Sequence, residues 1–190
     1  VSHLVHPNVV QVLDFERLDS EVFLAMEYVP GCDLGRLLAH LAEQGSALSR
    51  DESLYLVLEI VRGLRGLHER ATESGGGGAI LHGGLSPGNV LLTWEADVKV
   101  TDFCKSRTVD PDDAQLGERL AWMSPEQAGA APLDERSDLF SAGLLLYVVS
   151  TGRRLFTGET TDSLAWSVLS YEGFAEPDTE LVDPELRAVL

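Results

Sequence analysis

Two apolar runs near the start of the chain have the composition of β-strands. Residues 9–15 and 22–28 are rich in β-branched and aromatic side chains, and the polar stretch 16–21 separates them. This arrangement predicts a pair of antiparallel strands. The Pro30-Gly31 pair that follows is a turn signal, so we expect the sheet to end there.

A long helix is predicted after this sheet. Ser49 and Glu52 have the S-x-x-E spacing of a capping box, directly before an apolar run. Apolar residues then recur at the spacing of one helical face, namely Leu54, Val57, Leu58, Val61 and Leu64. We expect this helix to end near Arg70, before the flexible run 74–78. A shorter helix is predicted ahead of it, from Leu34 to about Glu43.

The second half of the chain has mostly helical patterns. Two short strands are predicted at 90–93 and 98–100, and a long irregular stretch at 105–121. Two amphipathic helices are expected, around Phe140, Leu144, Tyr147 and Val148, and around Leu164, Val168 and Leu169. A strand pair followed mainly by helices is the element order of an α+β fold.

The first two strands are too few to form a stable sheet by themselves. They therefore resemble the end of a larger sheet. We expect uncovered apolar surface on this strand pair, at Val10, Val12, Val22 and Leu24.

The chain is strongly acidic. Fourteen Lys and Arg against 31 Asp and Glu give a net charge of −17, which repels nucleic acid and anionic membrane surfaces. Two cysteines, Cys32 and Cys104, are too few for a disulfide framework and fit a reducing compartment. The longest apolar run, 142–149, is much shorter than the roughly 20 residues that span a bilayer. We expect no nucleic-acid partner, no membrane insertion of this segment, and a cytoplasmic location, alone or as part of a longer membrane protein.

Several short motifs occur in a fixed order. Residues 82–89 read HGGLSPGN, residues 102–104 read DFC, and residues 124–126 read SPE. The segment 134–143 then reads DERSDLFSAG. Two further motifs precede these four, HPN at residues 6–8 and MEYV at residues 26–29. One such match would be weak, but the whole series in order is specific.

In this order and spacing the chain resembles a eukaryotic-type protein kinase, most like the bacterial serine/threonine kinases. The family's catalytic loop reads H-R-D-L-x-x-x-N, its metal motif D-F-G, and its activation segment ends in A-P-E. The resemblance implies an α+β, protein-kinase-like fold. Residues 1–29 correspond to the end of the N-lobe and the hinge, and residues 30–190 to a mostly helical C-lobe without its last helices.

The resemblance implies two metal ligands, Asn89 and Asp102. Their amide and carboxylate oxygens suit Mg²⁺, which prefers hard oxygen ligands. An ordinary Asn turn and an Asp at the end of a strand are the structural alternatives for these two residues.

The resemblance also implies an ATP site. The backbone of Glu27 and Val29 would face the adenine, Asp33 the ribose, and Leu91 would pack beneath the base. A hinge strand that binds no nucleotide would have the same sequence, so this site is an expectation only.

The catalytic loop departs from the family pattern. Gly84 stands at the position of the catalytic aspartate, which orients or accepts the proton of the substrate hydroxyl. Ser86 stands at the position of the lysine two residues later, and Gly83 at that of the preceding arginine. Arg119 replaces the threonine that faces the aspartate, after Glu118 in place of a glycine. The aspartate, the lysine and the threonine normally contact one another, so their joint loss indicates the loss of one shared function.

Residues with scaffold roles in the family are better preserved. His82 and Phe103 match the hydrophobic spine, with Val12 as a further member. Asp138 matches a buried aspartate that accepts hydrogen bonds from the catalytic-loop backbone. Cys104 replaces the glycine of D-F-G. His68 has no Cys or His partner at zinc spacing, so we interpret it as structural. Glu126 normally pairs with a late arginine, for which Arg136 is the only candidate substitute.

The sequence predicts a pseudokinase, that is, a kinase-like regulatory or binding module with protein partners and weak residual binding of ATP and Mg²⁺. No residue is assigned a catalytic role. The alternative is an active serine/threonine protein kinase with a divergent loop, which the retained Asn89 and Asp102 would favour. A fragment without stable function is a third possibility.

Overall fold

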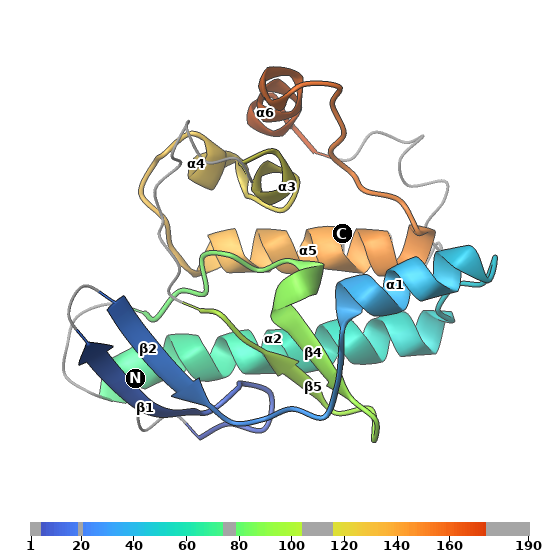
Figure 1. Cartoon of the computed structure of the whole chain (residues 1–190). Helices are drawn as coiled ribbons and strands as arrows, with labels where there is room; N and C mark the ends of the chain where they lie inside the picture. Colours follow the sequence, from blue (N-terminus) through green and yellow to red (C-terminus); the bar gives the residue numbers. More distant parts are fainter. Residues whose placement is uncertain (1–4, 19–20, 74–78, 104–115, 174–190) are drawn as a thin grey trace.

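The computed structural model describes residues 5–18, 21–73, 79–103 and 116–173. The molecule has more helix than strand, and two small sheets lie at one side of the long helix α2 (Figure 1). The strands are β1 (Val12–Leu18), β2 (Glu21–Met26), β3 (Gly31–Asp33), β4 (Val90–Thr93) and β5 (Val98–Val100). The helices are α1 (Leu34–Glu43), α2 (Arg50–Glu73), α3 (Leu116–Leu120), α4 (Pro125–Ala128), α5 (Glu135–Thr151) and α6 (Thr161–Leu169), with a 3₁₀ turn η1 at Pro87–Asn89. The predicted α+β class is confirmed.

Helices α2 and α5 pack against each other and form the centre of the core. The capping box of α2 is confirmed: Glu52 accepts from the Ser49 N–H at 2.7 Å, and the Ser49 hydroxyl accepts from the Glu52 N–H at 3.3 Å. The predicted face of α2 is confirmed in part: Leu64 is buried and Val57 and Val61 pack against the core, but Leu58 is half exposed. The buried row comprises Ser53, Leu56, Ile60, Gly63, Leu64, Leu67 and His68.

Strands β3, β4 and β5 form an antiparallel sheet beside α2. The bounds of β4 and β5 agree with the prediction, and the first strand pair ends before Pro30-Gly31 as expected, but strand β3, which begins at Gly31 in this second sheet, was not predicted. Gly31 pairs with Thr93, and a Cβ at Gly31 would lie 1.7 Å from the carbonyl oxygen of Leu92. Glycine therefore permits the close approach that lets β3 join the sheet.

Strands β1 and β2 form a separate antiparallel pair, as predicted. The chain before β1 is held by β5, since the Val10 N–H donates to the Val100 carbonyl at 2.9 Å and the Val100 N–H to the Asn8 carbonyl at 2.8 Å. This attachment buries Val10 and Val12, so the expectation that they are uncovered is wrong. Leu24 is half exposed, as expected, and the side chain of Val22 lies outside the described part.

The short helices α3 and α4 pack against α6, on the side of α5 away from α2 (Figure 1). The irregular stretch predicted at 105–121 is wrong in its last part, because α3 occupies Leu116–Leu120. Residues 104–115 and 74–78 lie outside the described residues, as does Cys104. Helix α5 ends at Gly152, whose φ of 68° is the left-handed conformation of a common helix C-cap. Within the described ranges, no helix is both long enough and apolar enough to cross a membrane.

The strand pair β1–β2 is expected to bind a hydrophobic dye. Phe15 and Leu24 are cross-strand partners and are 60% and 49% exposed, and Leu13 and Phe23 are similarly uncovered. We expect the double variant Phe15→Ser, Leu24→Ser to lose most of the anilinonaphthalene sulfonate fluorescence of the unmodified chain. Leu58→Ser, which removes an equally exposed leucine from α2, is the control. Equal dye fluorescence in the double variant and the unmodified chain would contradict this assignment.

Candidate functional site

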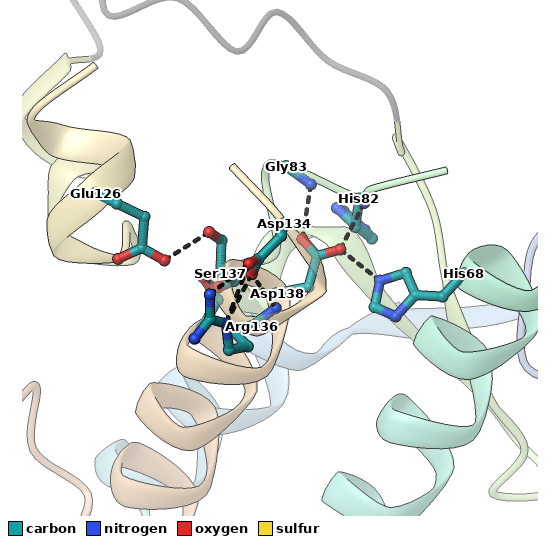
Figure 2. A network of polar contacts seen from close by, with 9 residues as sticks. His68, His82, Gly83, Glu126, Asp134, Arg136, Ser137 and Asp138 are labelled. Carbon is teal, nitrogen blue, oxygen red and sulfur yellow. Dashed lines mark hydrogen bonds and ion pairs between the residues drawn. The ribbon is translucent and has the colours of Figure 1, made fainter. Parts of the chain in front are cut away.

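The loop 81–89 follows α2, ends in η1 and is fixed to α5 by a buried carboxylate. Asp138 accepts the His82 N–H at 2.8 Å and the Gly83 N–H at 2.9 Å (Figure 2). His68, at the end of α2, donates from Nε2 to the same carboxylate at 2.8 Å. Asp138 therefore joins α2, the loop and α5, which confirms its predicted anchoring role. The interpretation of His68 as structural agrees with this contact.

The buried groups of this anchor have shifted pKa values. Burial alone would raise the pKa of Asp138, but hydrogen bonds from His68 and from the Gly83 and His82 N–H groups outweigh it and lower that pKa. Burial lowers the pKa of His82, although the nearby charge of Asp138 opposes this. The carboxylate is therefore held ionised and the His82 imidazole neutral near pH 7.

Two side-chain amides fix the shape of the loop. Gln127 Nε2 donates to the Gly83 carbonyl and Asn89 Nδ2 to the Gly84 carbonyl, each at 2.7 Å. Gly83 has a φ of 67°, a left-handed conformation that favours glycine. Gly84 is not in that region, so its backbone conformation permits a side chain.

The two predicted metal ligands lie at the same end of the sheet. The Thr101 N–H donates to the Asn89 carbonyl at 3.0 Å, so the residue next to Asp102 is hydrogen-bonded to Asn89. Because Asn89 Nδ2 is committed to Gly84, its amide oxygen is the atom left for a cation. Asp102 is partly exposed and has a φ of 61°, an uncommon conformation for a residue other than glycine. This pair of hard oxygen donors fits Mg²⁺.

The four predicted nucleotide contacts gather around the three-stranded sheet. Leu91 pairs with Asp33 on one side and with Lys99 on the other. Lys99 in turn forms an ion pair of 2.8 Å with Glu27, which lies just after β2. Val29 lies between Glu27 and β3 in the connecting segment. Glu27, Asp33 and Leu91 are thus linked through the sheet and Lys99, and their contact with a nucleotide stays a prediction.

The side chains of Glu27 and Asp33 have structural partners. Glu27 accepts from Lys99 and from the Gln11 N–H, each at 2.8 Å. Partial burial favours a neutral carboxyl here, but these two donors outweigh it and lower the pKa of Glu27. Asp33 caps α1 by accepting the Arg36 N–H at 2.9 Å. Within the described residues, the Glu27 carbonyl and the Val29 N–H make no hydrogen bond, so both remain available to a ligand.

A pocket of about 200 Å³ lies where the family has its catalytic aspartate. Its wall includes Gly84, Ser86, Asn89 and Arg119, so the structure brings together the three altered positions inferred from the sequence. Arg119 is the only charged residue among the described residues that line it. The pocket therefore has a cation where an active family member has a carboxylate.

A second polar contact lies beside this pocket. Arg154, just after α5, forms a 3.0 Å ion pair with Glu118 and lies 5.5 Å from the ring centre of Trp122. Trp122 also lines the pocket beside Gly84. Arg154 was not predicted as a site residue, because nothing in its local pattern links it to residues more than thirty positions earlier.

The expected pairing of Glu126 with Arg136 is wrong. Glu126 accepts a hydrogen bond from the Ser137 hydroxyl, whereas Arg136 forms its ion pair with Asp134, at 2.7 Å (Figure 2). Asp134 also caps α5 by accepting the Arg136 N–H at 2.9 Å. Arg136 is thus committed to the start of its own helix.

Two of the predicted spine residues are fully buried. Val12 is 6% and His82 0% exposed, and Phe103 is partly buried against the core. Gln127 and Lys99 were missed as site residues, because each finds its partner through the fold. The sequence shows only a glutamine directly after Glu126, and its burial and its contact with the loop come from the fold.

Comparisons with known proteins agree with this geometry. The family model described as Protein kinase domain matches residues 1–185. The tyrosine-protein kinase MasK of Myxococcus xanthus is 30% identical over 194 residues, which cover 98% of this chain and 30% of MasK. The serine/threonine-protein kinase PrkC of Bacillus subtilis is 30% identical over 176 residues, or 90% of this chain and 25% of PrkC. The chain thus spans between a quarter and a third of the length of these relatives.

One solved structure bears on the fold. The kinase domain of PknI from Mycobacterium tuberculosis matches with a TM-score of 0.64 and 24% identity, over 80% of this chain and 54% of that domain. The expected kinase-like α+β fold is therefore confirmed.

Proposed function

Because the chain belongs to the protein kinase family, we propose that it is a pseudokinase, a regulatory module that binds protein partners and transfers phosphate at most very slowly. The observation that carries this proposal is the pocket beside Gly84, which has Arg119 but no carboxylate in its described wall. Phosphate transfer in the family uses an aspartate there to orient the substrate hydroxyl.

The expected loss of rate is large. General acid–base help contributes roughly 10²–10⁴ in rate, and typical kinases turn over at about 1–100 s⁻¹. Loss of the base alone would bring turnover below about 1 s⁻¹. Ser86 in place of the lysine removes a cation from the phosphate site, which lowers the rate further.

The scaffold around the altered residues supports a retained binding role. Asp138, Gln127 and Asn89 still hold the loop through four hydrogen bonds of 2.7–2.9 Å. The loop therefore keeps a defined shape that a ligand or partner could bind. We propose a cytoplasmic site of action, in line with the low cysteine content.

Residual nucleotide binding belongs to the same proposal. The amide oxygen of Asn89 and the carboxylate of Asp102 would hold Mg²⁺, and the Glu27 carbonyl and the Val29 N–H would meet the adenine. The Lys99–Glu27 ion pair fixes the hinge segment to β5, so this edge keeps its shape without a ligand. A bound Mg²⁺ ion would supply the positive charge that offsets the nucleotide phosphates.

An active kinase is the second candidate, and the retained Asn89 and Asp102 favour it. The relatives MasK and PrkC carry kinase names, so likeness alone would suggest activity. A transfer assay on the unmodified full-length protein separates the two functions. Robust transfer of radiolabelled phosphate from ATP to a generic serine/threonine substrate would overturn the pseudokinase proposal.

Nucleotide binding is expected to be weak and dependent on Mg²⁺. In calorimetric titrations of the full-length protein, Asp102→Ala should remove the Mg²⁺ dependence and weaken ATP binding about tenfold or more. Asp97→Ala, which alters an exposed acid on the same hairpin, should bind like the unmodified protein. Heats that are unchanged by Asp102→Ala would eliminate the metal role.

A further inference from the structure

We propose that the pocket beside Gly84 binds the phosphate group of a phosphorylated serine or threonine in a protein partner. This inference rests on the proposed function and specifies the partner, because a working catalytic aspartate at Gly84 would repel such a ligand. The chain would then bind phosphorylated segments instead of producing them.

The charge in the pocket favours an anion. Arg119 is the single charged residue in its described wall, although the chain as a whole has a net charge of −17. A guanidinium group suits phosphate because its donors form a planar fork that can make paired hydrogen bonds. Arg119 also makes a contact within the free protein, and the five N–H donors of its guanidinium allow a phosphate to bind in addition to that contact.

The other polar groups of the pocket do not oppose an anion. The carbonyls of Gly83 and Gly84 are both occupied by amide donors, from Gln127 and Asn89. The Ser86 hydroxyl is half-buried, stands at the start of η1 and makes no side-chain capping bond. It can therefore donate to a phosphate oxygen beside Arg119.

A neighbouring groove offers a path for the rest of the peptide. A second pocket of about 500 Å³ lies between α1, η1 and the end of α5, and it shares Ser86 and Trp122 with the first pocket. Its wall includes the apolar Leu38 and Val148, together with the Arg154–Glu118 pair. Because Glu118 is already paired, the groove suits a segment with apolar residues beside the phosphorylated one.

Trp122 provides a direct reporter. The chain has three tryptophans, and Trp94 and Trp166 are 75% and 72% exposed, whereas Trp122 is 8% exposed and lines both pockets. Trp94→Phe and Trp166→Phe together would leave emission from Trp122 alone. Titrating this protein with a short peptide that has one phosphoserine between leucines is expected to give a saturable change in emission.

Each test variant has a control: Arg119→Ala and Arg153→Ala both remove one positive charge, and Gly84→Asp and Gly84→Asn add side chains of similar size. Arg119→Ala should weaken binding of the phosphoserine peptide roughly ten- to a hundredfold. Arg153→Ala removes an exposed arginine that lines neither pocket and should leave affinity unchanged. Gly84→Asp should abolish binding by placing a carboxylate in the pocket, while Gly84→Asn, of similar size but neutral, should retain more of it. If Arg119→Ala fails to fold, the comparison of Gly84→Asp with Gly84→Asn still tests the proposal.

The remaining arms identify the source of the anion. Equal affinity for the serine and phosphoserine peptides, or no effect of either Arg119→Ala or Gly84→Asp, would overturn the proposal. A glutamate peptide that binds as tightly as the phosphoserine peptide would overturn the preference for phosphate. Inorganic phosphate that binds as tightly as the peptide would overturn the peptide groove. A phosphate-transfer assay on the same protein separates the two proposals. Robust phosphate transfer would overturn the pseudokinase function, whether or not the phosphoserine peptide binds.

Discussion

Asp138→Ala is expected to lower the free energy of unfolding by several kcal/mol, at roughly 1–3 kcal/mol for each buried donor left without an acceptor. The change would leave the His82 and Gly83 N–H groups and His68 without their acceptor in the core. Urea denaturation, followed by tryptophan emission, measures the effect. Asp134→Ala, four residues earlier on the same helix, is the control. It removes an exposed helix cap and should cost only about 0.5–2 kcal/mol.

The effect of Asp138 should also depend on pH. The pKa of Asp138 is lowered in the folded protein, so its ionised form is favoured by folding. The stabilisation is therefore present above the unfolded pKa, near 4, and is lost as the pH falls through the lower folded value. The difference in stability between the unmodified protein and Asp138→Asn should shrink steadily below about pH 4. A difference that stays constant from pH 7 to pH 3 would show that hydrogen-bond geometry alone, and not charge, is responsible.

Local pattern was sufficient for most of the fold. The bounds of α1, β4 and β5 agree with the prediction, because each element is bounded by a cap or a turn that is visible in the sequence. Strand β3 was missed since three residues hold no periodicity, and its pairing depends on a close backbone approach at Gly31. The buried face of α2 was only partly predicted, because it includes Ser53, Gly63 and His68, which a count of apolar residues ignores.

The site residues, like the elements of the fold, include some that the sequence predicts and some that it does not. Motif order was enough to place Asn89, Asp102 and Asp138, because family resemblance carries positions that are far apart in the chain. Contacts such as Lys99 with Glu27, 72 residues earlier, leave no periodic signal in either segment. The substitution of Arg136 for a missing arginine failed for a local reason, since the nearby cap residue Asp134 holds its guanidinium. Sequence reasoning thus found the groups that the motifs name but not the side chains that hold them.

Gly84→Asp alone is expected to leave phosphate transfer close to the blank set by Asp102→Ala. Gly84 is outside the left-handed region, so an aspartate there causes no backbone strain of that kind. The new carboxylate would share its pocket with Arg119, which can pair with it, lower its pKa and hold it away from a substrate hydroxyl. Ser86, in the same wall, supplies no charge for the transferred phosphate.

The triple variant Gly84→Asp, Ser86→Lys, Arg119→Thr should transfer more phosphate than the three single variants summed, because residues in contact couple energetically. Restoring the base alone addresses a factor of roughly 10²–10⁴, but only if that base is positioned correctly. Removing Arg119 frees the carboxylate, and a lysine at Ser86 returns the cation to the phosphate site. The assay is transfer of radiolabelled phosphate to a generic serine/threonine substrate by the full-length protein. Robust transfer by Gly84→Asp alone would show that the three losses are independent, whereas transfer only by the triple variant would show that Arg119 and Ser86 keep the site inactive together with Gly84.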